Sequence, residues 1–206
     1  MKKNKPNKRW LQEQQSDLYV KKSREHQYRS RAVYKLQEID QKDKLIQQGS
    51  YVVDLGAAPG SWSQYAAEKV GKKGRVFAFD ILEMEPIMHV DFIHGDFTEE
   101  EAEQRLLSKI NQNQIDLVIS DMAPNLTGIR ATDQARSIAL CELVLDFSGK
   151  VLKPGGDLLI KVFEGAGTQE FRQQLQEQFD LVLTRKPDAS RDKSREFYVL
   201  ARSYSL

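Results

Sequence analysis

The stretch YVVDLGAAPGSW, residues 51–62, decides the fold of this chain. An apolar, β-branched run ends in a loop of small residues, and a helical pattern begins directly after it, which predicts a strand–turn–helix unit. Gly56 and Gly60 are four positions apart with Pro59 between them, so the loop matches neither G-x-G-x-x-G nor a P-loop. We interpret it as a loop that holds a nucleoside cofactor at the end of a first strand.

Strands and helices alternate from this loop onward. The apolar pattern predicts strands at residues 51–55, 75–80, 91–96, 115–121, 157–163, 181–184 and 197–201, and helices near 30–47, 61–70, 98–111, 128–152 and 168–178. Ser30 and Thr98 are expected to cap their helices, and residues 153–156 to form a tight turn. Near-continuous apolar strands between helices predict an α/β fold with a mostly parallel seven-stranded sheet, helices on both faces and an antiparallel edge.

The composition is that of a globular protein. Of 206 residues, 40% are hydrophobic and 30% charged, which favours a single domain over residues 21–206 behind a basic arm at 1–20. No apolar run reaches the roughly 18 residues of a membrane span, and no apolar segment follows the basic N-terminus as in a secretory signal. The single cysteine, Cys141, lies in a helical apolar pattern and is expected to be a buried thiol. We expect a cytoplasmic monomer without a metal ion.

The charges are segregated along the chain. Residues 1–35 contain 11 Lys and Arg against 3 Asp and Glu, whereas the remainder is mildly acidic. Tyrosines are interleaved with the cations at residues 19–35, and such rings can stack on bases while the cations neutralise phosphates. The segment 1–35 is therefore a candidate RNA contact. The alternative is a solvated run of charges whose aromatic rings pack on the body.

Three predicted strands end in an acid: Asp80, Asp96 and Asp121. Asp80 lies 20 residues after Gly60, the distance at which nucleoside-binding folds place an acid on ribose hydroxyls, and Asp96 could bind an exocyclic amine of the base. Trp62 could pack on the cofactor or fill the core. The loop has no cradle for a diphosphate, so the sequence favours S-adenosylmethionine over NAD.

Two charged residues occur in apolar strands. Lys161 belongs to LLIKVF at 158–163, and Glu196 opens EFYVLA at 196–201. A buried charge is costly unless it is paired, so such residues usually pair or function. For Lys161 the alternative is an ammonium that reaches solvent at the end of its strand.

Several motifs together resemble one known family. They are VDLGAAPGSWSQ at 53–64, SDMAPN at 120–125 with Thr127 and Gly128, SRAVYKL at 30–36, LKPGG at 152–156, and PDASR at 187–191 followed by SRE at 194–196. In order and spacing they resemble the FtsJ-type ribose 2′-O-methyltransferases of ribosomal RNA, from about residue 17 to the C-terminus. One departure is Ser61, where that family often has glycine.

The resemblance implies a Rossmann-like fold that binds S-adenosylmethionine. It also implies methyl transfer to the 2′-hydroxyl of a ribose, a uridine, in ribosomal RNA of the large subunit. The family's catalytic tetrad falls on Lys35, Asp121, Lys161 and Glu196, with Lys161 as proton acceptor, and its cofactor contacts fall on Gly60, Trp62, Asp80, Asp96 and Asp121.

The protonation state of Lys161 is not decided by the sequence. Burial and Lys35 would favour the neutral amine, whereas Asp121 and Glu196 would favour the ammonium. Transfer RNA and an mRNA cap are alternative substrates for the same chemistry. A ribosome-assembly factor that binds RNA without catalysis, and an NAD oxidoreductase, are the alternatives from other functional classes.

Overall fold

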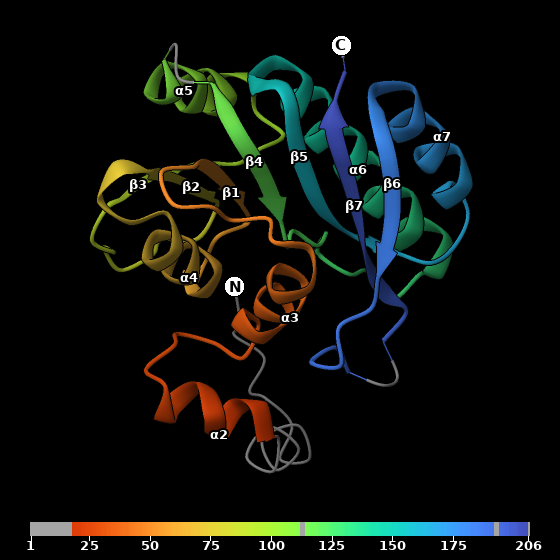
Figure 1. Ribbon diagram of the computed structural model, residues 1–206. Helices are drawn as coiled ribbons and strands as arrows, with labels where there is room; N and C mark the ends of the chain where they lie inside the picture. The colour runs from red at the N-terminus through yellow and green to blue at the C-terminus, as the bar shows by residue number, and fades with distance from the viewer. Residues whose placement is uncertain (1–17, 112–113, 192–193, 206) are drawn as a thin grey trace.

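A seven-stranded sheet runs through the computed structural model, which describes residues 18–111, 114–191 and 194–205 (Figure 1). Its strands are β1 Tyr51–Leu55, β2 Arg75–Asp80, β3 Val90–His94, β4 Ile115–Ser120, β5 Leu152–Phe163, β6 Phe179–Arg185 and β7 Glu196–Tyr204. Their order in space is β3-β2-β1-β4-β5-β7-β6. Neighbouring strands are parallel except at β5–β7 and β7–β6. This confirms the predicted mostly parallel sheet with an antiparallel edge.

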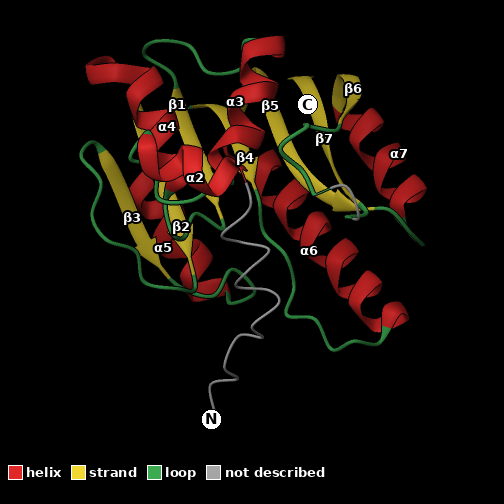
Figure 2. Cartoon of the chain, turned by 90° about the horizontal axis from the view of Figure 1, so that it is seen from below, coloured by secondary structure: helices red, strands yellow, loops and turns green. Residues whose placement is uncertain are grey.

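Helices cover both faces of the sheet, as Figure 2 shows. They are α2 Leu18–Glu25, α3 Val33–Asp43, α4 Ser61–Val70, α5 Glu100–Ile110, α6 Arg130–Val151 and α7 Thr168–Gln178, with a short 3₁₀ turn at Gly71–Lys73. Buried side chains of α3 and α4 form one core cluster with the sheet, and those of α5, α6 and α7 form the other. In the part of the chain that the structure describes, no helix is both long enough and apolar enough to cross a membrane.

The alternation of side chains along β5 and β7 brings charged residues to the α3 side. Leu159 and Tyr198 belong to the core cluster that contains α3. Because residues two apart on a strand point to the same face, Lys161 lies on the face of Leu159, and Glu196 on the face of Tyr198. Lys35 belongs to α3 itself. The fold therefore directs these charged side chains towards one another.

Two predicted helix caps are wrong. α3 begins only at Val33, and the hydroxyl of Ser30 lies 2.8 Å from that of Ser61 instead of capping the helix. α5 begins at Glu100, while the Thr98 hydroxyl donates to Asp96 at 2.7 Å. In both cases the hydroxyl contacts another polar side chain before the helix starts.

The turn predicted at residues 153–156 is also wrong, because β5 already begins at Leu152. Its pairing with β4 shifts in register between Ile115 and Leu117, and Gly155 has a φ of 80°. The segment is thus an irregularity within a strand, of the kind that glycine permits. Most of the predicted arm, residues 1–17, lies outside the described residues, and residues 18–20 open α2.

Candidate active site

The structure brings the four residues of the predicted tetrad into two ion pairs. Lys161 Nζ lies 3.0 Å from Asp121 Oδ1 and also donates to the Asp121 backbone carbonyl. Lys35 Nζ lies 2.6 Å from Glu196 Oε1. The first pair joins β5 to the residue after β4, and the second joins α3 to β7. Only 8% of the Lys161 side chain is exposed, so the charge that appeared costly in the sequence is paired.

Tyr198 connects the two ion pairs. It faces Lys161 across the β5–β7 ladder, its hydroxyl donates to Asp121 Oδ1 at 2.6 Å, and Lys35 Nζ lies 5.7 Å from the centre of its ring. Burial and the neighbouring Asp121 raise the pKa of Tyr198 well above its usual value, so the phenol stays a donor. Tyr198 could not be predicted as a site residue from the sequence, because a tyrosine in an apolar strand gives no signal beyond ordinary core packing.

The electrostatics of Asp121 favour its ionised form. Burial raises the pKa of Asp121, but the ammonium groups of Lys161 and Lys35 and the hydrogen bond from Tyr198 outweigh burial, and the pKa lies below its usual range. The carboxylate is therefore a fixed negative charge beside Lys161.

The single cysteine is a buried thiol, as the sequence predicted. The thiol of Cys141 lies 3.5 Å from the Lys161 backbone carbonyl, and burial raises the pKa of this thiol to about 12, as expected of a structural cysteine.

A cavity of about 690 Å³ opens next to Asp121 at the carboxyl ends of the parallel strands. It is lined by the loop after β1, the end of β2, the segments after β2, β3 and β4, and one side of α6. Gly56 lies at its floor with a φ of 79°, and a Cβ built there would come within 2.4 Å of Met122 Cγ. Only glycine allows this close approach of the loop to the chain after β4. The volume suits a nucleoside-sized ligand.

Asp80 and Asp96 line this cavity together with Asp121. Asp80 accepts hydrogen bonds from the backbone amides of Ala58, at 2.8 Å, and Leu82, at 2.7 Å. Asp96 accepts from the amide and hydroxyl of Thr98, and these bonds lower its pKa. Both acids thus fix the surrounding loops. Asp80 retains a lone pair on each carboxylate oxygen, and Asp96 retains those of Oδ2, because both bonds from Thr98 end on Oδ1.

Gly60 and Trp62 do not line the cavity. Gly60, with a φ of 104°, is covered by the side chain of Met84. The Trp62 side chain is buried, its indole N–H donates to the Ala32 carbonyl at 2.7 Å, and its ring centre lies 5.7 Å from that of Tyr198. Of the two roles that the sequence left open for Trp62, the structure favours core packing.

A buried carboxyl group, that of Asp54, lies in β1 just before the loop. Asp54 of β1 is completely buried; its Oδ2 accepts from the Ser63 hydroxyl at 2.6 Å, and its Oδ1 has no hydrogen-bond partner among the described residues. Burial raises the pKa of Asp54 to about 7; the Ser63 bond partly offsets this, and Asp121 and Asp80 add to it. The acids that do line the cavity, Asp80, Asp96 and Asp121, fit a cationic ligand such as S-adenosylmethionine, which carries a sulfonium and an ammonium. In the sequence Asp54 gives the same signal as Lys161, a charge in an apolar strand.

Comparison with known proteins points in the same direction. A family model described as FtsJ-like methyltransferase matches residues 28–204. A protein of Alkalilimnicola ehrlichii is 56% identical over 97% of this chain and 95% of its own, and one of Legionella pneumophila strain Corby is 52% identical over the full length of both; each is named Ribosomal RNA large subunit methyltransferase E.

Two solved structures resemble this one. A crystal structure described as a ribosomal RNA methyltransferase from Plasmodium falciparum has a TM-score of 0.77 and 29% identity, and covers 86% of this chain and 98% of its own. A structure described as an rRNA-methylase from Clostridium thermocellum, with a TM-score of 0.52 and 18% identity over 81% of this chain and 95% of its own, supports the fold alone.

Proposed function

Because this chain belongs to the FtsJ-like methyltransferase family, we propose that it transfers a methyl group from S-adenosylmethionine to the 2′-hydroxyl of a ribose in ribosomal RNA of the large subunit. The names of the relatives support this RNA as substrate, and the family resemblance suggests a uridine. The observation that carries the proposal is the pairing of Lys161 with Asp121 beside an acid-lined cavity. A ribosomal substrate agrees with the predicted cytoplasmic location.

The residues around the cavity suit the cofactor in specific ways. We propose that Asp80 binds the ribose hydroxyls, that Asp96 binds the exocyclic amine of the base, and that Gly56 lets the loop approach closely. Gly60 and Trp62 act indirectly in this proposal, by fixing the loop from behind. When bound, S-adenosylmethionine supplies an electrophilic methyl group on sulfur that a nucleophile attacks in line.

Lys161 would position the substrate hydroxyl and, once its ammonium has given up a proton to solvent, receive the hydroxyl's proton on the lone pair of the neutral amine. The Asp121 side chain and carbonyl hold two sides of its amino group, which leaves one direction for the 2′-hydroxyl. A ribose hydroxyl is a poor nucleophile, so positioning and proton removal are the two tasks of the protein. Asp121 and Tyr198 would fix the orientation of Lys161, and the pair of Lys35 and Glu196 would hold the ribose.

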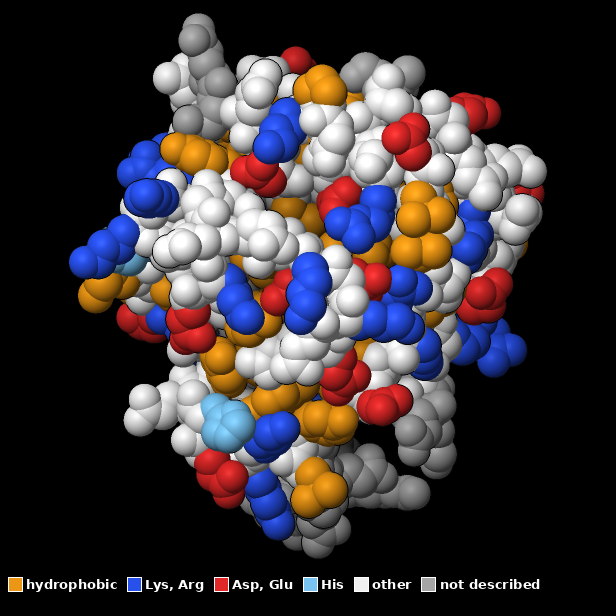
Figure 3. All heavy atoms as spheres, in the orientation of Figure 1, with side chains coloured by type: hydrophobic (Ala, Val, Ile, Leu, Met, Phe, Trp, Pro, Cys, Tyr) orange, Lys and Arg blue, Asp and Glu red, His pale blue; other side chains and the backbone are white. Residues whose placement is uncertain are grey.

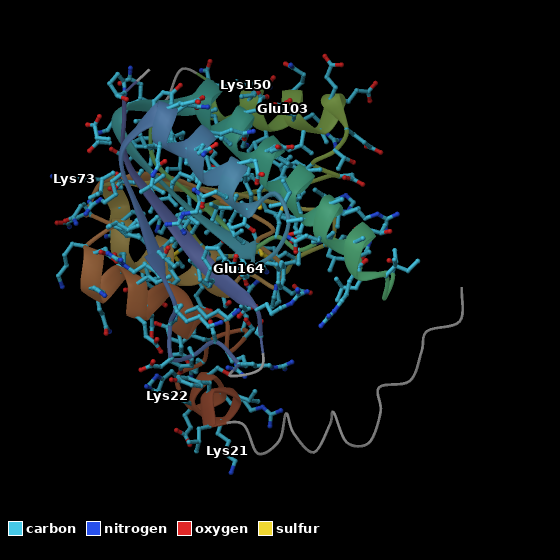
Figure 4. The ribbon with its side chains drawn as sticks, turned by 90° about the vertical axis from the view of Figure 1, so that its right-hand side faces the viewer. Lys21, Lys22, Lys73, Glu103, Lys150 and Glu164 are labelled. Atoms are coloured by element: carbon cyan, nitrogen blue, oxygen red, sulfur yellow. The ribbon has the colours of Figure 1, made fainter. Side chains whose placement is uncertain are left out.

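The basic segment would contribute phosphate contacts. Lys21, Lys22 and Arg24 are exposed on α2, and Figure 4 shows Lys21 and Lys22 projecting at one end of the molecule. Figure 3 shows Lys and Arg side chains, interspersed with acidic ones, on the face that carries α2 and α3. This pattern fits a sequence-independent contact with an RNA backbone.

Methyl transfer from labelled S-adenosylmethionine tests the proposal. Isolated large subunits, naked ribosomal RNA and transfer RNA are compared, and the methylated nucleotide is mapped. We expect incorporation at a ribose 2′-oxygen of large-subunit RNA and a loss of about 10²–10⁴-fold in Lys161→Ala. The matched control is Lys150→Ala, which removes a lysine paired with Glu103 at the end of the molecule opposite α2 (Figure 4).

Three results would contradict the proposal. Near wild-type methylation by a folded Lys161→Ala protein would exclude the proposed role of that lysine. Exclusive labelling of transfer RNA would replace the substrate. RNA binding without any methyl incorporation would favour the assembly-factor alternative.

A further inference from the structure

Arg29 joins three segments of the chain through its guanidinium group. Nη1 donates to the backbone carbonyls of Pro59, at 3.2 Å, and Glu85, at 2.6 Å, and Nη2 donates to that of Pro86, at 2.8 Å. Pro59 belongs to the loop after β1, and the other two belong to the connection between β2 and β3. Arg29 itself lies between α2 and α3. A planar fork with several fixed donors is suited to such bridging.

The bridged connection, residues 81–89, lies over the loop after β1. A Cβ at Gly60 would come within 2.6 Å of Met84 Sδ, 2.8 Å of Ile87 Cδ1 and 3.0 Å of Arg29 Nη1. On its other side the connection lines the cavity through Ile81 and Leu82. The same short segment therefore covers the loop and forms part of the cavity wall, and it contains no regular secondary structure.

The region around Arg29 is attached to the loop and to α4 at further points. The side-chain amide of Gln64 donates to the Gln27 carbonyl at 3.2 Å, and the hydroxyls of Ser30 and Ser61 are 2.8 Å apart. The connection between α2 and α3 thus rests directly on the start of α4. Any ligand that holds α2 and α3 in place would also favour the observed arrangement of the loop.

We propose that Arg29 is a positioning residue for the methyl donor: it holds residues 81–89 over the loop, and it makes cofactor binding and RNA binding favour each other. The inference rests on the proposed function, because it takes the cavity as the cofactor site and the basic α2–α3 face as an RNA contact. Coupling between two binding sites is reciprocal. RNA would therefore strengthen cofactor binding by the same factor as the cofactor strengthens RNA binding.

Calorimetry with S-adenosylmethionine tests whether Arg29 positions the residues that bind the methyl donor. We expect Arg29→Ala to bind about tenfold more weakly, since charge-assisted bonds at a half-exposed site contribute modestly, and Arg29→Lys to fall between the two. The KM for the donor should rise while kcat changes little, and amide exchange should accelerate across residues 82–89. Arg172→Ala, which removes an arginine of α7 that donates to the Thr184 hydroxyl, is the matched control and should leave donor affinity and exchange unchanged.

The coupling between RNA binding and cofactor binding is tested with S-adenosylhomocysteine, which permits no turnover. Its affinity is measured with and without saturating protein-free large-subunit RNA. RNA should increase the affinity of the wild type for S-adenosylhomocysteine several-fold, and that of Arg29→Ala much less. Equal donor affinity and equal exchange in the wild type and both folded Arg29 variants would overturn the inference, as would an RNA effect that persists in Arg29→Ala. A wild-type protein that binds no donor would instead overturn the proposed function.

Discussion

Replacing Asp54 by Asn should remove a large pH dependence of stability. The pKa of this carboxyl is about 7 in the folded protein, against about 3.9 in an unfolded chain. Between these values the folded state binds a proton that the unfolded state does not, so the free energy of unfolding falls as pH rises from about 4 to 7. At 1.36 kcal/mol per pH unit, a difference of about three units corresponds to about 4 kcal/mol.

Urea unfolding of the wild type and Asp54→Asn at several pH values from 4 to 8 measures this effect. The Asn side chain does not titrate, so the stability of the variant relative to the wild type should rise by about 4 kcal/mol over pH 4–7 and then level off. Any change in the bond from Ser63 adds an offset that is the same at every pH. Asp180→Asn, at an exposed position of β6, should show no such trend. A difference between wild type and Asp54→Asn that is flat over pH 4–7, or that has the opposite slope, would refute the reasoning.

Three further substitutions test other parts of the structure. Gly56→Ala places a Cβ at a positive φ, 2.4 Å from a neighbouring side chain, so calorimetry should find donor binding at least tenfold weaker. Tyr198→Phe removes a donor from the Asp121 carboxylate and should lower kcat about tenfold in the methylation assay, with donor affinity unchanged. Asp43→Asn breaks a two-bond pair with Arg185 and should reduce stability by about 1–2 kcal/mol in urea at neutral pH. Hydrogen bonding from Arg185 lowers the pKa of Asp43, so that difference should vanish as pH falls below about 4.

The sheet and two of its charged residues could be predicted from the sequence, because both depend on the strand pattern. Apolar runs located the strands, and Lys161 and Glu196 were conspicuous as charges within such runs. Each lysine lies beside a carboxylate because β5 pairs with β7 and α3 lies over both strands. Sequence spacing specifies neither of these contacts.

Contacts made in the folded protein explain most of the details that could not be predicted from the sequence. Whether Ser30 or Thr98 caps a helix depends on what else its hydroxyl contacts. For Ser30 this is Ser61, which only the folded arrangement brings near, and for Thr98 it is the neighbouring Asp96. Tyr198 is chemically ordinary until its hydroxyl is seen on Asp121. Arg29 was one cation among many in a basic segment, and only the three carbonyls around it distinguish it.

The position of β7 has a consequence for synthesis of the chain. β7 follows β6 in sequence but lies between β5 and β6 in the sheet, and it carries both Glu196 and Tyr198. On the ribosome, Lys35, Asp121 and Lys161 emerge well before these two residues. The residues along the cavity wall all precede β5, whereas two partners of the lysine pairs lie on the strand of this sheet that is translated last. Loss of this one late strand would therefore remove Glu196 and Tyr198 from the site while every residue that lines the cavity stays in the chain.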